Sequence, residues 1–267
     1  MGLTASEFAD LPERLLQYGI SVTFENQQDY SIVCLNPGNI ALHLIPARNH
    51  FTAEALLALQ ATYQNKNTML IQLWADVWIS RKQQVLDRLR SLSGINKRIH
   101  GRKTQIITIN QAEADDFLQS NHIQGAVKAR YKYALQYDDD IVAVATFSNT
   151  RLMTQHQQEY RSAELIRFAS KAGLTVTGGL TKLIRYYCSK HKVHDIMTYA
   201  DRDWSDGKGY LATGFVLTQA IEPTSLWIDP VHLKRYFNHR LPEGEQGSEG
   251  TFIPAFNTGN LKFILYL

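Results

Sequence analysis

Two adjacent glycines, Gly178 and Gly179, stand between a predicted strand and a predicted helix, an order that suits anion binding. Glycine lets the backbone come close to a ligand, and the first amides of a helix point at it together with the positive end of the helix dipole. We therefore expect a phosphate or pyrophosphate to be held by Thr177, Gly178, Gly179, Leu180, Thr181 and the charge of Lys182. The spacing is neither that of a P-loop nor that of a dinucleotide fingerprint, and a turn needed only for chain geometry is the alternative.

A second group of polar residues follows a predicted strand that ends at Ala200. Asp201 and Arg202 come directly after this strand, at the edge where open α/β sheets bind ligands. Tyr210 lies on the next short helix, where its hydroxyl can act as a general acid for a departing thiolate. The alternatives are a helix-capping Asp, a surface Arg and a core Tyr.

His122 stands between a predicted helix and the next strand. It can face the glycine turn and form an acid/base pair or a metal pair with Asp201. A polar loop histidine is the alternative, and we predict no metal site.

Basic residues gather in one stretch, although the net charge of the chain is only +3. Between Arg81 and Lys103 the single acidic residue is Asp87. Such a stretch is either a contact for a polyanion such as DNA or a solvated helix face followed by a basic linker. The predicted nucleic-acid contacts are Arg81, Lys82, Arg88, Lys97, Arg98, Arg102 and Lys103.

The elements that would position these residues form two groups. The first 100 residues predict helices at 4–18 and 53–63 and a basic helix at 79–92. They also predict strands at 21–24, 30–35, 40–45 and 69–73, of which 30–35 and 40–45 form a hairpin. The rest mixes hairpins with helical crossovers, which predicts an α/β domain with a mixed sheet and helices on both faces. Its predicted helices are 111–119, 178–191 and 204–211. Its predicted strands are 105–108, 126–137, 141–147, 163–169, 195–200, 214–218 and 262–267. Residues 252–267 either cover the ligand cleft or extend a sheet edge.

The order of the predicted elements resembles the GCN5-related N-acyltransferase (GNAT) fold: a strand, the glycine turn, a helix and a strand precede Tyr210-x-x-x-Gly214-Phe215. The resemblance implies that the turn from Gly178 to Thr181 binds the pyrophosphate of acetyl-CoA or another acyl-CoA. It also implies that Tyr210 protonates the departing thiol. The turn of this chain, Leu174-x-x-Thr177-Gly-Gly-x-Thr181, departs from the QxxGxG/A pattern of that family.

A second resemblance covers nearly the whole chain. Three motifs are similar to those of a domain of phage and mobile-element proteins called Hef-like homing endonucleases. They are Phe117-Leu-x-x-Asn-His-Ile-Gln-Gly125, Glu164-Leu-Ile-Arg-Phe168 and Tyr199-Ala-Asp-Arg-x-Trp-Ser205. In those proteins the domain follows a Vsr/PD-(D/E)xK nuclease domain. The resemblance implies a nuclease-like domain over 1–103 and a GNAT-like domain over 104–267, the latter also loosely similar to Mom DNA-modification proteins.

The nuclease-like half lacks the carboxylates that would hold Mg²⁺. Val33 and Cys34 stand where an Asp is required, and His43 stands near the place of the expected Glu. We infer a domain that has kept its fold and lost cleavage. A remnant site of His43, Arg48, His50 and Asp76 is possible, and a structural role for each is the alternative.

These observations leave three hypotheses. The first is an acyl-CoA-dependent N-acyltransferase that acts on DNA or a DNA-associated substrate, with Tyr210, His122 and Asp201 moving protons and Arg202 contacting the cofactor. The second is a non-catalytic DNA-binding remnant of a homing endonuclease, and the third is a nuclease with a rearranged site. Two distant cysteines and the absence of a hydrophobic leader or an 18-residue apolar run predict a cytoplasmic protein without a membrane partner.

Overall fold

A computed structural model describes residues 6–27, 29–153, 159–241 and 251–267 of the chain. The chain divides into two compact units. Unit 1 comprises residues 1–94, 201–206 and 220–260, and unit 2 comprises residues 95–200, 207–219 and 261–267. Within the described residues, no helix is long and apolar enough to cross a membrane.

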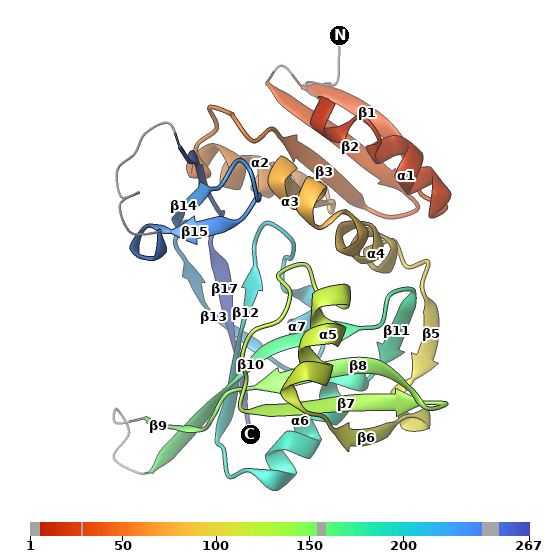
Figure 1. Ribbon diagram of the computed structural model, residues 1–267, viewed down its shortest axis with the longest axis vertical. Helices are drawn as coiled ribbons and strands as arrows, with labels where there is room; N and C mark the ends of the chain where they lie inside the picture. The colour runs from red at the N-terminus through yellow and green to blue at the C-terminus, as the bar shows by residue number, and fades with distance from the viewer. Residues whose placement is uncertain (1–5, 28, 154–158, 242–250) are drawn as a thin grey trace. The chain divides into compact units, whose positions relative to one another are not determined.

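Unit 1 is built on a four-stranded sheet in the order β1-β2-β3-β4 (Figure 1). The first three strands are antiparallel, and β4 returns parallel to β3 after a helical crossover. Every residue of β3 is buried, as its apolar sequence predicts. The strands are β1 (Ser21–Gln27), β2 (Tyr30–Asn36), β3 (Ile40–Ile45) and β4 (Met69–Trp74). The helices are η1 (Ser6–Phe8), α1 (Leu11–Gln17), α2 (Ala53–Asn65), α3 (Ala75–Ser80) and α4 (Lys82–Leu92).

A second, three-stranded sheet completes unit 1 with residues from late in the chain. Its order is β15-β14-β16, formed by β14 (Ser225–Ile228), β15 (Arg235–Phe237) and β16 (Ile253–Phe256), with η3 (Asn238–Arg240) after β15. Leu226, Ile228 and Ile253 form one buried cluster with Ile45 and Trp74 of the first sheet. The chain segment that leaves unit 2 after β13 and re-enters it at β17 therefore supplies part of the core of unit 1.

Unit 2 is built on an eight-stranded sheet with the main order β13-β17-β12-β10-β8-β7-β6, and β9 pairs with β10. The strands β6, β7, β8 and β10 are antiparallel neighbours, whereas β10 and β12 are parallel. The strands are β6 (Gln105–Thr108), β7 (Tyr131–Tyr137), β8 (Asp140–Phe147), β9 (Arg151–Met153), β10 (Tyr160–Ser170), β12 (Asp195–Asp201), β13 (Val216–Ile221) and β17 (Asn260–Tyr266).

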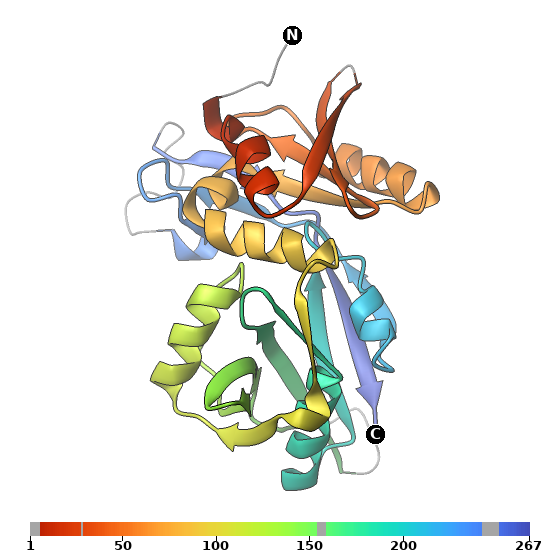
Figure 2. The ribbon, with the colours of Figure 1, turned by 90° about the vertical axis from the view of Figure 1, so that its right-hand side faces the viewer.

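Two helices cover opposite faces of this sheet (Figures 1 and 2). α5 (Gln111–Asn121) packs through Ala114 and Leu118 on Ala134, Val144 and Ala169. α6 (Gly179–Lys190) packs on the other face, where the core also includes Ala145 and Leu165. The two faces are called the α5 face and the α6 face below. A short helix, α7 (Lys208–Leu211), follows β12.

The mixed α/β class and the helices on both faces confirm the predicted architecture of the second half. The features that were not predicted include the β14–β16 sheet, the strand β9 that pairs with β10, and the strands β5 (Lys97–His100) and β11 (Leu174–Thr177), which pair in parallel as a two-stranded sheet. Residues 252–267 were expected either to cover the ligand cleft or to extend a sheet edge. In the structure β17 lies within the sheet, between β13 and β12, while β16 belongs to unit 1. The units are not the contiguous ranges 1–103 and 104–267, and the nuclease-like and GNAT-like identities stay predictions.

Candidate functional site

The two central parallel strands of unit 2 separate part-way along their length. β10 and β12 pair only over three residues, from Ser162↔Asp195 to Glu164↔Met197. A bulge between Leu165 and Arg167 then bends β10, because a bulge adds a residue to one strand and turns it away from its neighbour. Figure 1 shows β10 and β12 running in different directions beyond this point. This strand divergence leaves backbone groups in the middle of the sheet without a partner strand.

Hydroxyl groups line the strand divergence on the α6 face. The buried Thr198 donates a hydrogen bond of 2.9 Å to the carbonyl oxygen of Leu165, which β12 backbone would otherwise satisfy. The hydroxyl of Tyr210 lies 3.5 Å from the Thr198 hydroxyl. The Tyr210 ring packs on Phe215 and Phe263, so the phenol is held with its oxygen directed at the diverging strands. The predicted core position of Tyr210 and its predicted acid role are thus compatible.

The predicted anion turn forms the start of α6. Gly178 is exposed and has a φ of 74°, and a Cβ atom added there would meet nothing within 4 Å. Gly179 is buried for packing, because its Cβ would come within 3.0 Å of Leu135 and Val176. Among the described residues no side chain caps this helix, so its first amides remain available to an acceptor.

Lys182 and the segment after β5 support the turn from one side. Gly101 approaches so closely that a Cβ there would lie 3.0 Å from the carbonyl oxygen of Thr177. The ammonium group of Lys182 donates to the carbonyl oxygens of Gly101, at 2.9 Å, and Thr104, at 2.5 Å. Its charge therefore holds these segments together. Thr181 and Leu180 are half-buried, and Thr177 is exposed.

His122 lies on the α5 face, on the opposite side of the sheet from the α6 turn. It forms the C-cap of α5, and its Nδ1 accepts a hydrogen bond of 3.2 Å from the backbone N–H of Gln124. The following Gly125 carbonyl accepts from Arg167 of β10 at 3.4 Å. The structure thus places His122 near β10 and does not bring it to the glycine turn.

Asp201 and Arg202 belong to unit 1, whereas Tyr210 and the α6 turn belong to unit 2. Asp201 accepts a hydrogen bond of 3.0 Å from the backbone N–H of Asp203. The carbonyl oxygen of Arg202 accepts one of 2.8 Å from Gln60 on α2. The predicted grouping of these two residues with Tyr210 is therefore not found within either unit, and their cofactor and proton-transfer roles stay untested predictions.

Glu164 is a functional candidate that the sequence analysis did not single out. It is the last β10 residue paired with β12 before the strand divergence, and alternation with the buried Ala163 and Leu165 puts its side chain on the α5 face. Burial raises the pKa of Glu164, and the nearby Arg151 and Arg167 only partly oppose this. The available signal was a pair of charged residues, Glu164 and Arg167, within the otherwise apolar predicted strand 163–169.

The predicted nucleic-acid contacts differ in how they are engaged. Lys97, Arg98, Arg102 and Lys103 are exposed on β5 and on η2 (Gly101–Lys103), next to the α6 turn. Arg88 is exposed on α4, and Arg81 is half-buried before it. Lys82 instead forms an ion pair of 2.6 Å with Asp10 and lies 4.9 Å from the centre of the Trp78 ring.

The residues considered for a remnant nuclease site have mainly structural partners. His43 is fully buried, and its Nδ1 lies 2.7 Å from the side-chain oxygen of Gln72. Burial lowers the pKa of His43 to about 4, so the imidazole is neutral. Asp76 forms a two-point ion pair with Arg235, with distances of 2.6 and 2.9 Å. His50 packs against Phe51. No group of three or more metal-ligating side chains occurs among the residues that the structure describes.

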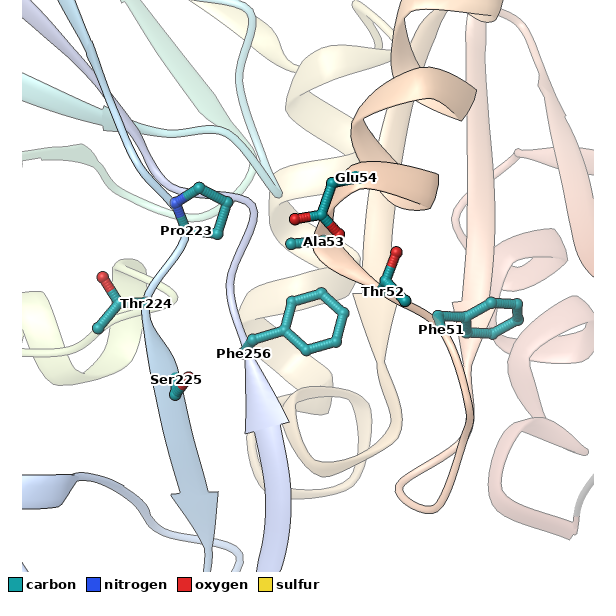
Figure 3. Close-up of a pocket in the computed structure, with 8 residues that line it drawn as sticks. All are labelled: Phe51, Thr52, Ala53, Glu54, Pro223, Thr224, Ser225 and Phe256. Carbon is teal, nitrogen blue, oxygen red and sulfur yellow. The ribbon is translucent and has the colours of Figure 1, made fainter.

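A separate cavity of about 310 Å³ lies in unit 1, at the start of α2 (Figure 3). Phe51, Thr52 and Glu54 line one side, and Thr224 and Phe256 line the other. Thr52 caps α2 through a hydrogen bond of 3.2 Å to the N–H of Ala55. The helix start therefore already has an acceptor, and Glu54 brings a negative charge, so this cavity does not attract an anion.

No protein-family model matches the sequence, and no curated protein matches it. Solved acetyltransferase structures are similar to part of the chain. An IAA acetyltransferase from Bacillus cereus is 15% identical, covers 61% of this chain and 99% of its own, and has a TM-score of 0.36. A GNAT family acetyltransferase from Elizabethkingia anophelis with acetyl-CoA bound is 13% identical over 62% and 99%, with a TM-score of 0.38. An acetyltransferase from Bacillus subtilis in complex with CoA is 18% identical over 62% and 99%, with a TM-score of 0.36.

Proposed function

We propose that unit 2 is an N-acyltransferase that takes its acyl group from an acyl-CoA. The strand divergence carries this proposal, because the pairing of β10 with β12 ends at Glu164 and Met197 in the middle of a sheet and the Tyr210 hydroxyl lies beside this point. A ligand with amide groups can pair with such an edge in the manner of an added strand. The sequence resemblance to the GNAT fold supports the same assignment.

The α6 turn fits the phosphate groups of an acyl-CoA. Gly178 leaves open space above it, and the amides of Gly179, Leu180 and Thr181 precede the first intrahelical bonds. The Thr177 hydroxyl can add a donor, and Lys182 fixes the turn from behind. When bound, the acyl-CoA would supply an acyl group already activated as a thioester. The chain would contribute orientation and the Tyr210 proton.

We extend the proposal to a DNA or DNA-associated acceptor. This extension is supported by exposed cations of β5 and η2 that lie beside the α6 turn: Lys97, Arg98, Arg102 and Lys103. A non-catalytic DNA-binding remnant of a homing endonuclease is the second candidate function, and the same cations favour it. DNA binding alone would weaken steeply with salt, because each neutralised phosphate releases counterions.

Thermal unfolding of the full chain with and without acetyl-CoA tests the proposal. A ligand that binds only the folded state stabilises it by about 2.7 kcal/mol at 100 times its Kd. We expect a concentration-dependent rise in Tm with acetyl-CoA, and a smaller one in the Gly178→Val variant. Tight, salt-dependent DNA binding without any response to acetyl-CoA would favour the second function.

A further inference from the structure

The cavity at the start of α2 combines an aromatic wall with a carboxylate, and the proposed function does not use it (Figure 3). Its volume of about 310 Å³ lies at the lower end of the range for small-molecule sites. All the residues that line it belong to unit 1, whereas the α6 turn belongs to unit 2. Thr52, Glu54 and Thr224 are exposed, so the cavity opens to solvent and a ligand can enter it.

The half-buried Phe256 forms the aromatic wall. Figure 3 shows its ring extending from β16 towards the start of α2, whereas the Phe51 ring points away from it. Trp74 packs perpendicular to Phe256, with ring centroids 5.2 Å apart and an angle of 89° between the planes. Pairing of Phe256 with Ser225 of β14 fixes its backbone. The ring is therefore held in place at the cavity, where an aromatic face attracts a cation.

Glu54 supplies the charge of the cavity. It stands in the first turn of α2, where hydrogen bonds from its own N–H and from the Thr52 hydroxyl lower its pKa. The carboxylate is therefore ionised at neutral pH. Among the residues that the structure describes, none of the groups that shift its pKa is a cation. Of the described residues that line the cavity, Glu54 alone is charged, so a cationic ligand is favoured.

Hydrogen-bond acceptors in the cavity favour a primary ammonium group over a quaternary one. The Thr52 hydroxyl oxygen accepts a hydrogen bond of 3.2 Å from the N–H of Ala55 and has a second lone pair. A primary ammonium group has three donors and no acceptor, which suits a carboxylate, a hydroxyl oxygen and an aromatic face together. A quaternary ammonium group would leave the carboxylate of Glu54 without a hydrogen-bond donor from the ligand.

We propose that the cavity binds the primary ammonium group of an alkylamine. Glu54 accepts its hydrogen bonds, and the Phe256 ring packs on its alkyl chain and its charge. This chemistry is shared by a free alkylamine and by the lysine side chain of a partner protein. The inference concerns unit 1 and does not depend on the acyl transfer proposed for unit 2.

Amide NMR of the full chain titrated with n-butylammonium chloride tests the site, with n-butanol as the neutral isostere and sodium chloride as the salt control. We expect saturable shifts at Ala53, Glu54 and Phe256 with butylammonium. Binding of n-butanol should be about tenfold weaker, the value of one charge-assisted hydrogen bond. Equal affinity for the two compounds, or shifts that sodium chloride reproduces, would overturn the cationic class. Tighter binding of tetramethylammonium than of butylammonium would overturn the primary amine.

Two variants assign the contacts: Glu54→Gln, with the exposed Glu222→Gln as control, and Phe256→Leu, with the exposed Phe237→Leu as control. Glu54→Gln changes a solvent-exposed side chain, so the fold is retained. It should weaken butylammonium binding about tenfold and leave n-butanol binding unchanged. Phe256→Leu should weaken butylammonium binding about two- to fivefold. Unchanged butylammonium affinity in Glu54→Gln would overturn the site.

A blocked tripeptide, acetyl-Gly-Lys-Gly-amide, distinguishes the two sources of the ammonium group. Its lysine carries the only ammonium group, so it matches butylammonium in chemistry and adds peptide backbone. Tighter binding of the peptide than of butylammonium would assign the cavity to a lysine of a partner protein. Equal or weaker binding would assign it to a free alkylamine. Binding of neither compound at the cavity would overturn the proposal.

Discussion

Asp76 was considered for a remnant nuclease site, and its ion pair with Arg235 gives it a structural role instead. The carboxylate is 2% exposed and the guanidinium 23% exposed, and the two make two hydrogen bonds. Removing one partner of a buried pair leaves an uncompensated charge and costs about 3–5 kcal/mol. We predict a loss of this size for Asp76→Ala by denaturant unfolding.

The double variant Asp76→Ala/Arg235→Met should recover part of the loss, because it removes both charges together. Additive losses would show that the two residues act independently. Nicking of DNA that requires Mg²⁺ and is abolished by Asp76→Ala would contradict the structural role.

Asp203 predicts how the stability of unit 1 depends on pH. It is buried, and burial, followed by the negative charge of Asp201, raises its pKa from 3.8 to about 7. Because the folded state holds the proton more tightly than the unfolded state, this group stabilises the fold at acid pH, and the contribution is lost as pH rises from about 4 to 7. We predict that Asp203→Asn reduces the fall in Tm between pH 5 and pH 8, measured by calorimetry. The hydrogen bonds from Thr258 can persist to the Asn oxygen. An identical pH dependence in the variant would contradict this assignment.

Sequence reasoning singled out Tyr210 and the glycine turn because each belongs to a local pattern, and their roles toward a ligand stay predictions. It gave no sign that Glu164 is the last β10 residue paired with β12, because this pairing joins two strands about 30 residues apart. It assigned the charge of Lys182 to a ligand, whereas the structure directs it to Gly101 and Thr104. The partners of a side chain cannot be assigned from its sequence neighbours when they lie 81 and 78 positions away.

At the scale of elements, Gly178 tests whether the α6 turn binds a ligand. Gly178→Ala should cost about 1–2 kcal/mol of stability, since its φ of 74° is unfavourable for any side chain. Gly19 is a matched control, with a φ of 76° and likewise nothing within 4 Å of an added Cβ. We predict that both variants lose similar stability by denaturant unfolding and that only Gly178→Ala weakens acetyl-CoA binding by calorimetry. Equal acetyl-CoA affinity in both variants would argue that the turn serves chain geometry only.

Elements with a strong local period were predictable, and those made by distant pairing were not. The predicted helix 178–191 and strand 163–169 lie within or close to α6 and β10, because apolar spacing fixes them. β5 and β11 are short strands of four residues that exist through pairing across 77 positions, from Lys97 to Leu174. The charged residues of β5 are typical of a linker in the sequence. They form a strand because they pair with β11.

At the scale of the molecule, unit 1 depends on residues from both ends of the sequence. The predicted boundary near residue 103 came from the grouping of the predicted elements, with a second group starting at the strand 105–108, and from the resemblance to a two-domain family. Sequence patterns give no sign that residues 220–260 return to the first unit, because that return is made by the Leu226–Ile228–Ile253 contact with Ile45 and Trp74.

We predict that Ile228→Ala, at a fully buried position, destabilises unit 1 by about 2–5 kcal/mol. Hydrogen exchange should then quicken at the amides of β3 and β4, and a fragment of residues 1–94 should show no cooperative unfolding. Exposed Val231→Ala serves as the control. Unchanged exchange in β3 and β4 of Ile228→Ala would show that unit 1 is stable without the inserted sheet.

The central claim, that unit 2 binds an acyl-CoA at the start of α6, is tested most directly by amide NMR of the full chain titrated with acetyl-CoA. The account predicts saturable shifts at Gly178, Gly179, Leu180 and Thr181, with a second group in β10 beyond Leu165. An absence of shifts at the α6 turn at millimolar acetyl-CoA, or shifts confined to the cavity at Thr52 and Phe256, would contradict it.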